Sequence, residues 1–231
     1  MAKVAAVAGV GPGNGAAIVR RFAAAGYKVA MLARNRDRLD DLAREAAAVA
    51  YACDVTSPQS VAAAFATIRA ELGEVEALIF NAGSGVFADV EHITPAEFEA
   101  SWRVNAYGAL LCAQQVIPAM KAAGNGAIVF IGATASRRGG PRSAAFAPAK
   151  AAQRALAESM ARSLWPAGIH VALIVVDGVV DLARTRGRMP DKPDSFFIKP
   201  TGVAETAYQL AIQDRSAWSF EVEARPFGET W

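Results

Sequence analysis

The strongest constraint on the fold of this chain lies at its start, where a short apolar run leads directly into closely spaced glycines. Residues 4–8 are typical of a buried strand, and residues 14–19 open an alanine-rich amphipathic segment typical of a helix. Glycine adopts left-handed dihedrals and lets a helix or a ligand approach the backbone closely. The turn between the two segments would present unpaired N–H groups at the positive end of the helix dipole, an arrangement that binds phosphate groups.

We therefore expect this turn to hold the pyrophosphate of a dinucleotide. A tight turn that binds nothing would use the same residue types, so the rest of the chain has to decide between the two interpretations. The residues expected to contact the cofactor at this turn are Gly9, Gly11, Gly13, Asn14 and Gly15.

Length and composition exclude several classes of protein. The 231 residues suit a single α/β domain, and no apolar run approaches the ~20 residues that a membrane helix needs. A formal net charge of +2, from 24 basic and 22 acidic residues, predicts no nucleic-acid surface. Cys53 and Cys112 lack metal-ligand spacing, so we expect reduced packing residues and no metal site. Because a strand begins at Val4, we also expect no signal peptide and a cytoplasmic protein.

Strand-like and helix-like segments alternate along the rest of the chain. After the first turn, strands are predicted at residues 28–33, 49–53, 77–80, 127–131, 170–176 and 220–224. Helices are predicted at residues 37–47, 57–72, 94–123 with a break near Ser101, 147–167 and 203–213. Near-continuous apolar strands joined by helices indicate a doubly wound parallel sheet with helices on both faces. Such sheets bind ligands at the carboxyl ends of their strands.

The residues after the second predicted strand bear on which dinucleotide is bound. An acidic residue there would bond the ribose 2′-hydroxyl of NAD(H), whereas an arginine suits the 2′-phosphate of NADP(H). This chain has Arg34 at that position, with Arg36 and Arg38 close by, so NADP(H) is favoured over NAD(H). A solvated loop with several arginines is the alternative.

Polar residues at two further strand ends complete the predicted cofactor site. Asp54, which precedes Val55, could accept a hydrogen bond from the adenine amine. The turn Asn81-Ala82-Gly83 could pass closely beneath the ribose, or Asn81 could simply tie neighbouring strands together.

Taken together, these motifs resemble the short-chain dehydrogenase/reductase family over nearly the whole chain. The family's TGxxxGxG motif matches residues 8–15, with Ala8 in place of threonine, and its Asn-Ala-Gly motif is intact at residues 81–83. Asn105 matches the family's helix asparagine. The resemblance implies a single Rossmann-type domain with about seven strands, binding of NADP(H) or NAD(H), and a homodimer or homotetramer. It further implies cofactor contacts at Val55, Lys150 and Gly178.

The family's catalytic signature is only half retained. Its YxxxK motif reads Phe146-Ala147-Pro148-Ala149-Lys150, and its serine would fall at Ala133, so Asn105 and Lys150 alone remain of the Asn-Ser-Tyr-Lys set. A phenol beside an ammonium group can give and take the proton that carbonyl reduction requires, and phenylalanine cannot. Losing such a group typically lowers the rate by ~10²–10⁴-fold. Thr134 and Ser136 flank the serine position and are candidates to supply a replacement hydroxyl.

Two functions are consistent with this pattern. The first is an oxidoreductase acting on a small carbonyl or alcohol, with the proton handled by Lys150, Asn105, a nearby hydroxyl or water. The second is a non-catalytic subunit or sensor that binds NAD(P)(H). Residues 178–200 lie where the family places its substrate lid. This segment contains Arg184, Arg186 and Arg188, which would contact either an anionic substrate or only solvent.

Overall fold

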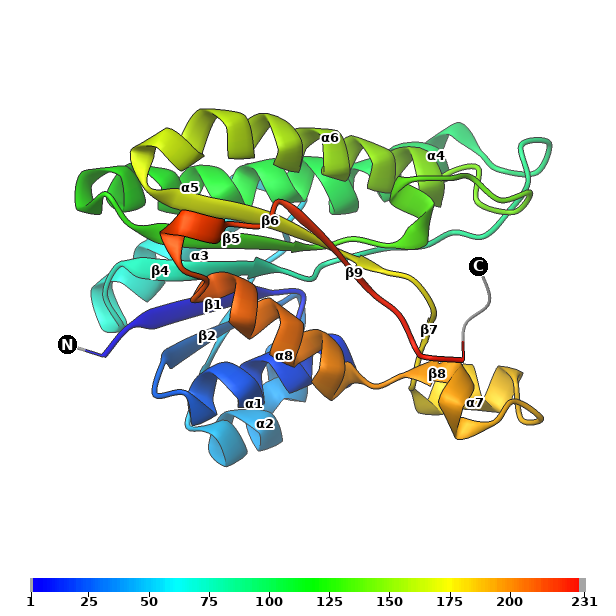
Figure 1. Cartoon of the computed structure of the whole chain (residues 1–231), viewed down its shortest axis with the longest axis horizontal. Coiled ribbons are helices and arrows are strands. Elements are labelled where there is room, and N and C mark those ends of the chain that lie inside the picture. The colour runs from blue at the N-terminus through cyan, green and yellow to red at the C-terminus, as the bar shows by residue number, and fades with distance from the viewer. Residues whose placement is uncertain (1, 229–231) are drawn as a thin grey trace.

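The computed structural model describes residues 2–228 and contains one central parallel sheet (Figure 1). Seven strands lie in the order β3-β2-β1-β4-β5-β6-β9, and every neighbouring pair is parallel. This confirms the predicted doubly wound sheet, because the order runs outward in both directions from β1 and β4. The strands are β1 (Val4–Ala8), β2 (Lys28–Ala33), β3 (Val49–Ala52), β4 (Val75–Phe80), β5 (Gly126–Ile131), β6 (Ile169–Val176) and β9 (Glu221–Ala224).

Helices cover both faces of the sheet, and each face has its own hydrophobic core (Figure 1). On β1, Ala6 and Ala8 face one core while Ala5 and Val7 face the other, because successive side chains of a strand point to opposite faces. This two-sided burial explains why the central strands β1, β5 and β6 are almost entirely apolar rather than alternating. One face is covered by α3 (Pro58–Glu71), α5 (Gly108–Ala123) and α6 (Phe146–Leu164), and the other by α1 (Asn14–Ala24), α2 (Asp40–Ala46) and α8 (Pro200–Ala211).

The long helical region before β5 is interrupted, as the sequence predicts. Helix α4 (Pro95–Trp102) begins with a capping box in which Thr94 Oγ1 accepts from the backbone N–H of Glu97, 3.2 Å away. A single turn of π-helix, Arg103–Tyr107, then separates α4 from α5. Such turns are rare and often found at functional sites, and this one carries Asn105.

Residues 177–200, where the sequence predicts no strand or helix, contain short pieces of both. Strands β7 (Val179–Val180) and β8 (Phe197–Ile198) form a small parallel pair, and α7 (Ala183–Arg188) lies between them in the chain. Arg186 holds this segment together, since its guanidinium pairs with Asp181 at 2.7 Å and with Asp194 at 2.5 Å. None of the helices within residues 2–228 is long and apolar enough to cross a membrane.

Two glycines offer a test of how tightly the connections around β5 and β6 are packed. Gly168 and Gly26 both have a left-handed backbone, with φ of +79° and +83°. A Cβ at Gly168 would collide with the Gly124 carbonyl oxygen, whereas a Cβ at Gly26 would meet nothing within 4 Å. Alanine at either position incurs the left-handed cost of ~1–2 kcal/mol. We expect Gly168→Ala to lose clearly more free energy of unfolding than Gly26→Ala in urea titrations. Equal losses would contradict the packing described for Gly168.

Candidate functional site

The glycine turn after β1 contains two kinds of glycine. At some positions a side chain would collide with neighbouring residues, and at one position there is room for a side chain. Gly9 has φ +87°, and a Cβ there would collide with the backbone of Ala82, on the turn that follows β4. A Cβ at Gly15 would lie 2.8 Å from Val10 Cα. At Gly11, by contrast, a Cβ would meet nothing within 4 Å. The turn therefore leaves its backbone accessible at Gly11, as a phosphate cradle requires.

The start of α1 also fits a dinucleotide. Asn14 is the first residue of the helix, and its Oδ1 atom is buried without a hydrogen-bond partner among the described residues. An unpaired buried acceptor costs about 1–3 kcal/mol, so a bound group with a donor would relieve that cost. Gly13 precedes the helix and lies against Leu182, because a Cβ on it would be 2.7 Å from Leu182 Cδ2.

The other predicted cofactor residues lie at the same sheet edge, because parallel strands end together. Arg34 follows β2 and is exposed. Asp54 follows β3 and accepts hydrogen bonds at Oδ1 from the Thr56 backbone N–H and hydroxyl, at 2.9 and 2.8 Å. Val55 is buried with its carbonyl oxygen against Gly108, where a Cβ would lie 2.9 Å away.

The Asn81-Ala82-Gly83 turn after β4 has the strand-tying role considered from sequence. Asn81 Nδ2 donates to the Gly9 carbonyl oxygen at 2.7 Å, and its backbone N–H donates to Ala8 at 2.9 Å. Gly83 lies close to both Asn105 and Lys150, since a Cβ on it would be 3.4 Å from Asn105 Oδ1 and 3.7 Å from Lys150 Nζ. Gly178, after β6, packs against Pro226.

Lys150 is the centre of a buried polar cluster under this edge. Its side chain projects from α6 and is only 5% exposed. Nζ donates to the Ile131 carbonyl oxygen at 2.9 Å and to Gln153 Oε1 at 3.1 Å. Gln153 Nε2 in turn donates to the Asn105 carbonyl oxygen at 2.9 Å. The cluster thus joins β5, α6 and the π turn through one continuous series of hydrogen bonds.

Asn105 is held rigidly but keeps one unused acceptor. Its Nδ2 donates to the carbonyl oxygens of Ser84 and Ser101, at 2.9 and 2.8 Å. Its Oδ1 is buried and has no partner among residues 2–228. Asn105 and Lys150, which the sequence singles out, are therefore brought together. Gln153 was missed, although its spacing of three residues from Lys150 on one helix places both side chains on the same face.

Burial lowers the pKa of Lys150 to about 7. Desolvation is the whole cause, because a charged amine is disfavoured away from water and no carboxylate contributes. Both the ammonium and the neutral amine are then populated near neutral pH. A group in that state can both donate and accept a proton, which is the property required of a general acid–base catalyst.

Phe146 and Ala133 stand where the resemblance predicts the family's tyrosine and serine. The Phe146 ring packs against the ring of Phe87, with centroids 5.3 Å apart, and lies with its centroid 6.0 Å from Lys150 Nζ. Ala133 precedes a short 3₁₀ turn over Thr134–Ser136. Neither ring nor methyl group can exchange a proton with a substrate.

The two hydroxyls proposed as substitutes are engaged within the protein. Ser136 Oγ donates to the Ala133 carbonyl oxygen at 2.7 Å. Thr134 Oγ1 donates to the carboxylate of Asp177, which also pairs with Arg225. Burial raises the pKa of Asp177, but the hydrogen bonds from Thr134 and Arg225 outweigh it and hold that pKa below its ordinary value.

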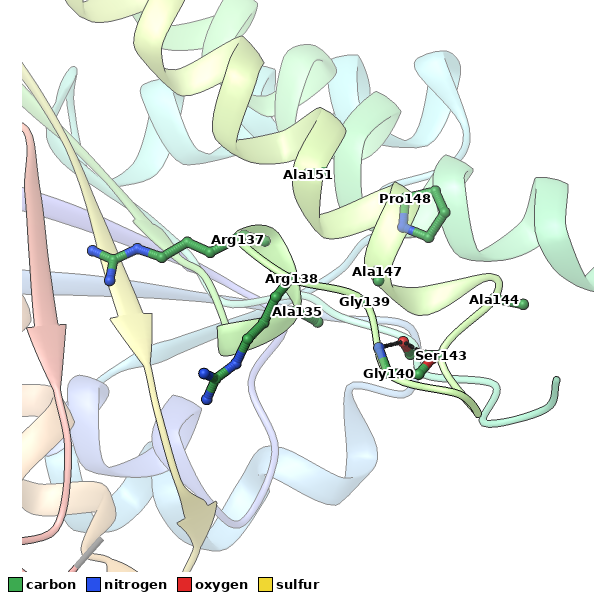
Figure 2. A pocket seen from close by; sticks show the side chains of 11 residues that line it. Ala135, Arg137, Arg138, Gly139, Gly140, Ser143, Ala144, Ala147, Pro148 and Ala151 are labelled. Atoms are coloured by element: carbon green, nitrogen blue, oxygen red, sulfur yellow. Dashed lines mark hydrogen bonds between the residues drawn. The ribbon is translucent and has the colours of Figure 1, made fainter. Parts of the chain in front are cut away.

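A cavity of about 360 Å³ lies beside this region, between the loop after β5 and the first turns of α6 (Figure 2). Arg137 reaches from the loop toward β9, where it pairs with Glu221 at 2.7 Å and Glu223 at 2.5 Å. Ser143 Oγ accepts from the Gly140 backbone N–H at 2.7 Å. The lining includes neither Phe146 nor Lys150, so this cavity adjoins the Lys150 cluster without containing it.

The chain is similar to known proteins both in sequence and in structure. Residues 3–191 match the family model for short chain dehydrogenases. The chain is 32% identical over 218 residues to the 3-oxoacyl-(acyl-carrier-protein) reductase MabA of Mycobacterium bovis, covering 91% of this chain and 85% of that protein. A metagenomic short-chain oxidoreductase in complex with NADP has a TM-score of 0.85 at 29% identity, with 98% of each chain covered. The 3-ketoacyl-(acyl-carrier-protein) reductase of Brucella melitensis, complexed with NADH, has a TM-score of 0.88 at 27% identity, with 97% of each chain covered.

The buried amine predicts a specific pH dependence of stability. In the unfolded chain the lysine pKa is about 10.4, so between pH 7 and pH 10 the unfolded state binds a proton that the native state lacks. The free energy of unfolding should therefore rise with pH across this window, as the cost of burying the charge is relieved. We expect that rise to be absent in Lys150→Met, which serves as the matched control for all other titrating groups. Urea titrations at pH 6.5 and 9.5 measure it, and parallel changes in both proteins would refute it.

Proposed function

Because the chain belongs to the short-chain dehydrogenase family, we propose that it is an NAD(P)(H)-dependent oxidoreductase for a small carbonyl or alcohol, with Lys150 as its proton donor and acceptor. The observation that carries this proposal is the buried Lys150, hydrogen-bonded at Nζ and with a pKa of about 7, at the same edge of the sheet as the glycine turn after β1. We also propose that residues 1–231 form a single domain.

The proposed chemistry follows from the residues of this cluster. Bound NADPH would supply a hydride to a carbonyl carbon, and the oxygen left as an alkoxide needs a proton. Lys150 would give that proton from its ammonium form and would take one back as a neutral amine in the reverse reaction. Asn105 Oδ1, which has no partner among the described residues, would accept a hydrogen bond from a substrate hydroxyl or a water. The glycine turn and Asn14 would hold the cofactor.

A non-catalytic NAD(P)(H)-binding subunit or sensor is the second candidate function. It is favoured by the Phe146 ring, which packs on Phe87 and cannot transfer a proton, and by the internal hydrogen bonds of Thr134 and Ser136. Both functions require the same cofactor site, and they differ only in whether Lys150 acts on a substrate.

The family implies a nicotinamide cofactor, and we propose a preference for NADP(H). Arg34 supports it, since it is exposed at the end of β2, where the ribose of a dinucleotide would lie. We further propose a cytoplasmic homodimer or homotetramer. Small residues exposed along one side of α6 would allow close contact with a second subunit: Pro148, Ala151, Ala155 and Ser159.

Charge reversal at Arg34 tests the cofactor preference. A charge-assisted hydrogen bond is worth about 1.5–3 kcal/mol, so Arg34→Asp should weaken NADPH binding by about 10- to 100-fold and leave NADH binding unchanged or tighter. Arg162→Asp, with the same change in charge on an exposed arginine near the end of α6, is the control and should change neither affinity. Fluorescence titration of both cofactors measures this, and an unchanged NADPH affinity in Arg34→Asp would overturn the preference.

Restoring the missing phenol tests the catalytic assignment. In a screen of aldehydes, ketones and alcohols followed by NADPH absorbance, we expect slow turnover in the natural protein, loss of turnover in Lys150→Ala, and a gain approaching ~10²–10⁴-fold in Phe146→Tyr. The natural protein and Phe146→Tyr differ by one hydroxyl oxygen, so the gain reports the phenol alone. Cofactor binding with turnover only in Phe146→Tyr would instead establish the sensor function.

A further inference from the structure

Gln153 is an unusual residue for its position on α6. It is fully buried, on the face of the helix that packs onto the sheet, where its neighbour one turn later is Ala157. A buried amide costs free energy unless both of its ends are hydrogen-bonded, and an aliphatic side chain would fill the same space without that requirement. Both ends are in fact bonded, to Lys150 and to Asn105.

The two partners fix the direction of the amide. The Asn105 carbonyl oxygen can only accept, so the NH₂ group of Gln153 must face the π turn, at 2.9 Å. The oxygen Oε1 then faces Lys150 Nζ, at 3.1 Å. An ammonium group has three N–H donors, of which Ile131 and Gln153 receive two. The direction of the remaining donor is thereby determined.

The amide is also uncharged, which matters for a proton donor. A carboxylate at the same place would stabilise the ammonium and hold its proton at neutral pH. The groups that meet Nζ from the packed elements are neutral ones: the Ile131 carbonyl from β5, the Gln153 amide from α6 and the Phe146 ring at 6.0 Å.

We propose that Gln153 is a positioning residue for Lys150: its amide, anchored on the Asn105 carbonyl of the π turn, fixes the direction in which Lys150 presents its remaining N–H to the substrate without adding charge to the cluster. This inference rests on the proton-transfer role proposed for Lys150. Gln153 does not touch the substrate in this scheme, and it acts only through Lys150.

Two variants separate positioning from a merely structural role. Gln153→Met keeps the volume and removes the acceptor, so kcat should fall about tenfold or more while the KM for NADPH stays within about twofold. Gln153→Glu keeps the shape and adds a charge. It should raise the Lys150 pKa from about 7, and with it the pH at which carbonyl reduction declines, by about one to three pH units. Unchanged kcat and an unchanged pH profile in both variants would overturn the proposal.

Nitrogen-15 NMR of the lysine amines provides a readout that needs no substrate. The Lys150 signal, assigned by its loss in Lys150→Ala, should titrate near pH 7 in the natural protein and at higher pH in Gln153→Glu, and its hydrogens should exchange faster with water in Gln153→Met. If the natural protein, Gln153→Met and Gln153→Glu show the same Lys150 titration and the same hydrogen exchange, the proposal is overturned. If Gln153→Met does not fold, an unchanged Lys150 titration in Gln153→Glu is enough to overturn it. If the natural protein shows these NMR changes but no turnover, the proposed function is refuted. The positioning of Lys150 by Gln153 would still be established.

Discussion

The close contact between the turns after β1 and β4 is the constraint on which the site depends. Gly9 can adopt its left-handed turn only because it has no side chain, and it then lies directly against the backbone of Ala82. Asn81 fastens the contact by donating to the Gly9 carbonyl oxygen. Since these strands are central and parallel, the contact brings the accessible backbone at Gly11 and the pair of Asn105 and Lys150 near Gly83 to one edge of the sheet.

The second requirement is a charged group kept in an apolar interior. Burying an unpaired ammonium group is strongly unfavourable. A buried amine therefore either pairs with an opposite charge or loses its proton more readily, so that its pKa falls. Among residues 2–228, Lys150 has carbonyl and amide acceptors and no carboxylate partner, so its pKa falls toward neutrality. The same arrangement that weakens the fold at low pH makes the amine able to exchange a proton. The stability cost and the proton exchange proposed for Lys150 thus have one physical origin.

The sequence predicted those features that depend on local pattern. Apolar runs predicted the central strands, and the expected glycine turn and strand-end residues lie together because strand ends in a parallel sheet share an edge. Asn105 and Lys150, which lie on helical segments, were singled out by the family resemblance. It could not predict features set by side-chain direction or by distant contacts: the amide of Gln153 between two elements, the hydrogen bond of Thr134 to Asp177, and the cover of Gly13 by Leu182. The short strands β7 and β8 were missed for the same reason, since two-residue strands carry no periodicity.

If these features work together as proposed, the chain binds a nicotinamide dinucleotide along the carboxyl edge of the sheet, beside the buried Lys150 cluster. A crystal structure of the protein grown with NADPH tests it most directly. We expect the pyrophosphate against the turn from Gly11 to Asn14, the 2′-phosphate beside Arg34, and the nicotinamide end close to Lys150. Crystals saturated with NADPH that show no cofactor along this edge of the sheet, or that show Phe87 and Phe146 closing the space beside Lys150, would refute this binding mode.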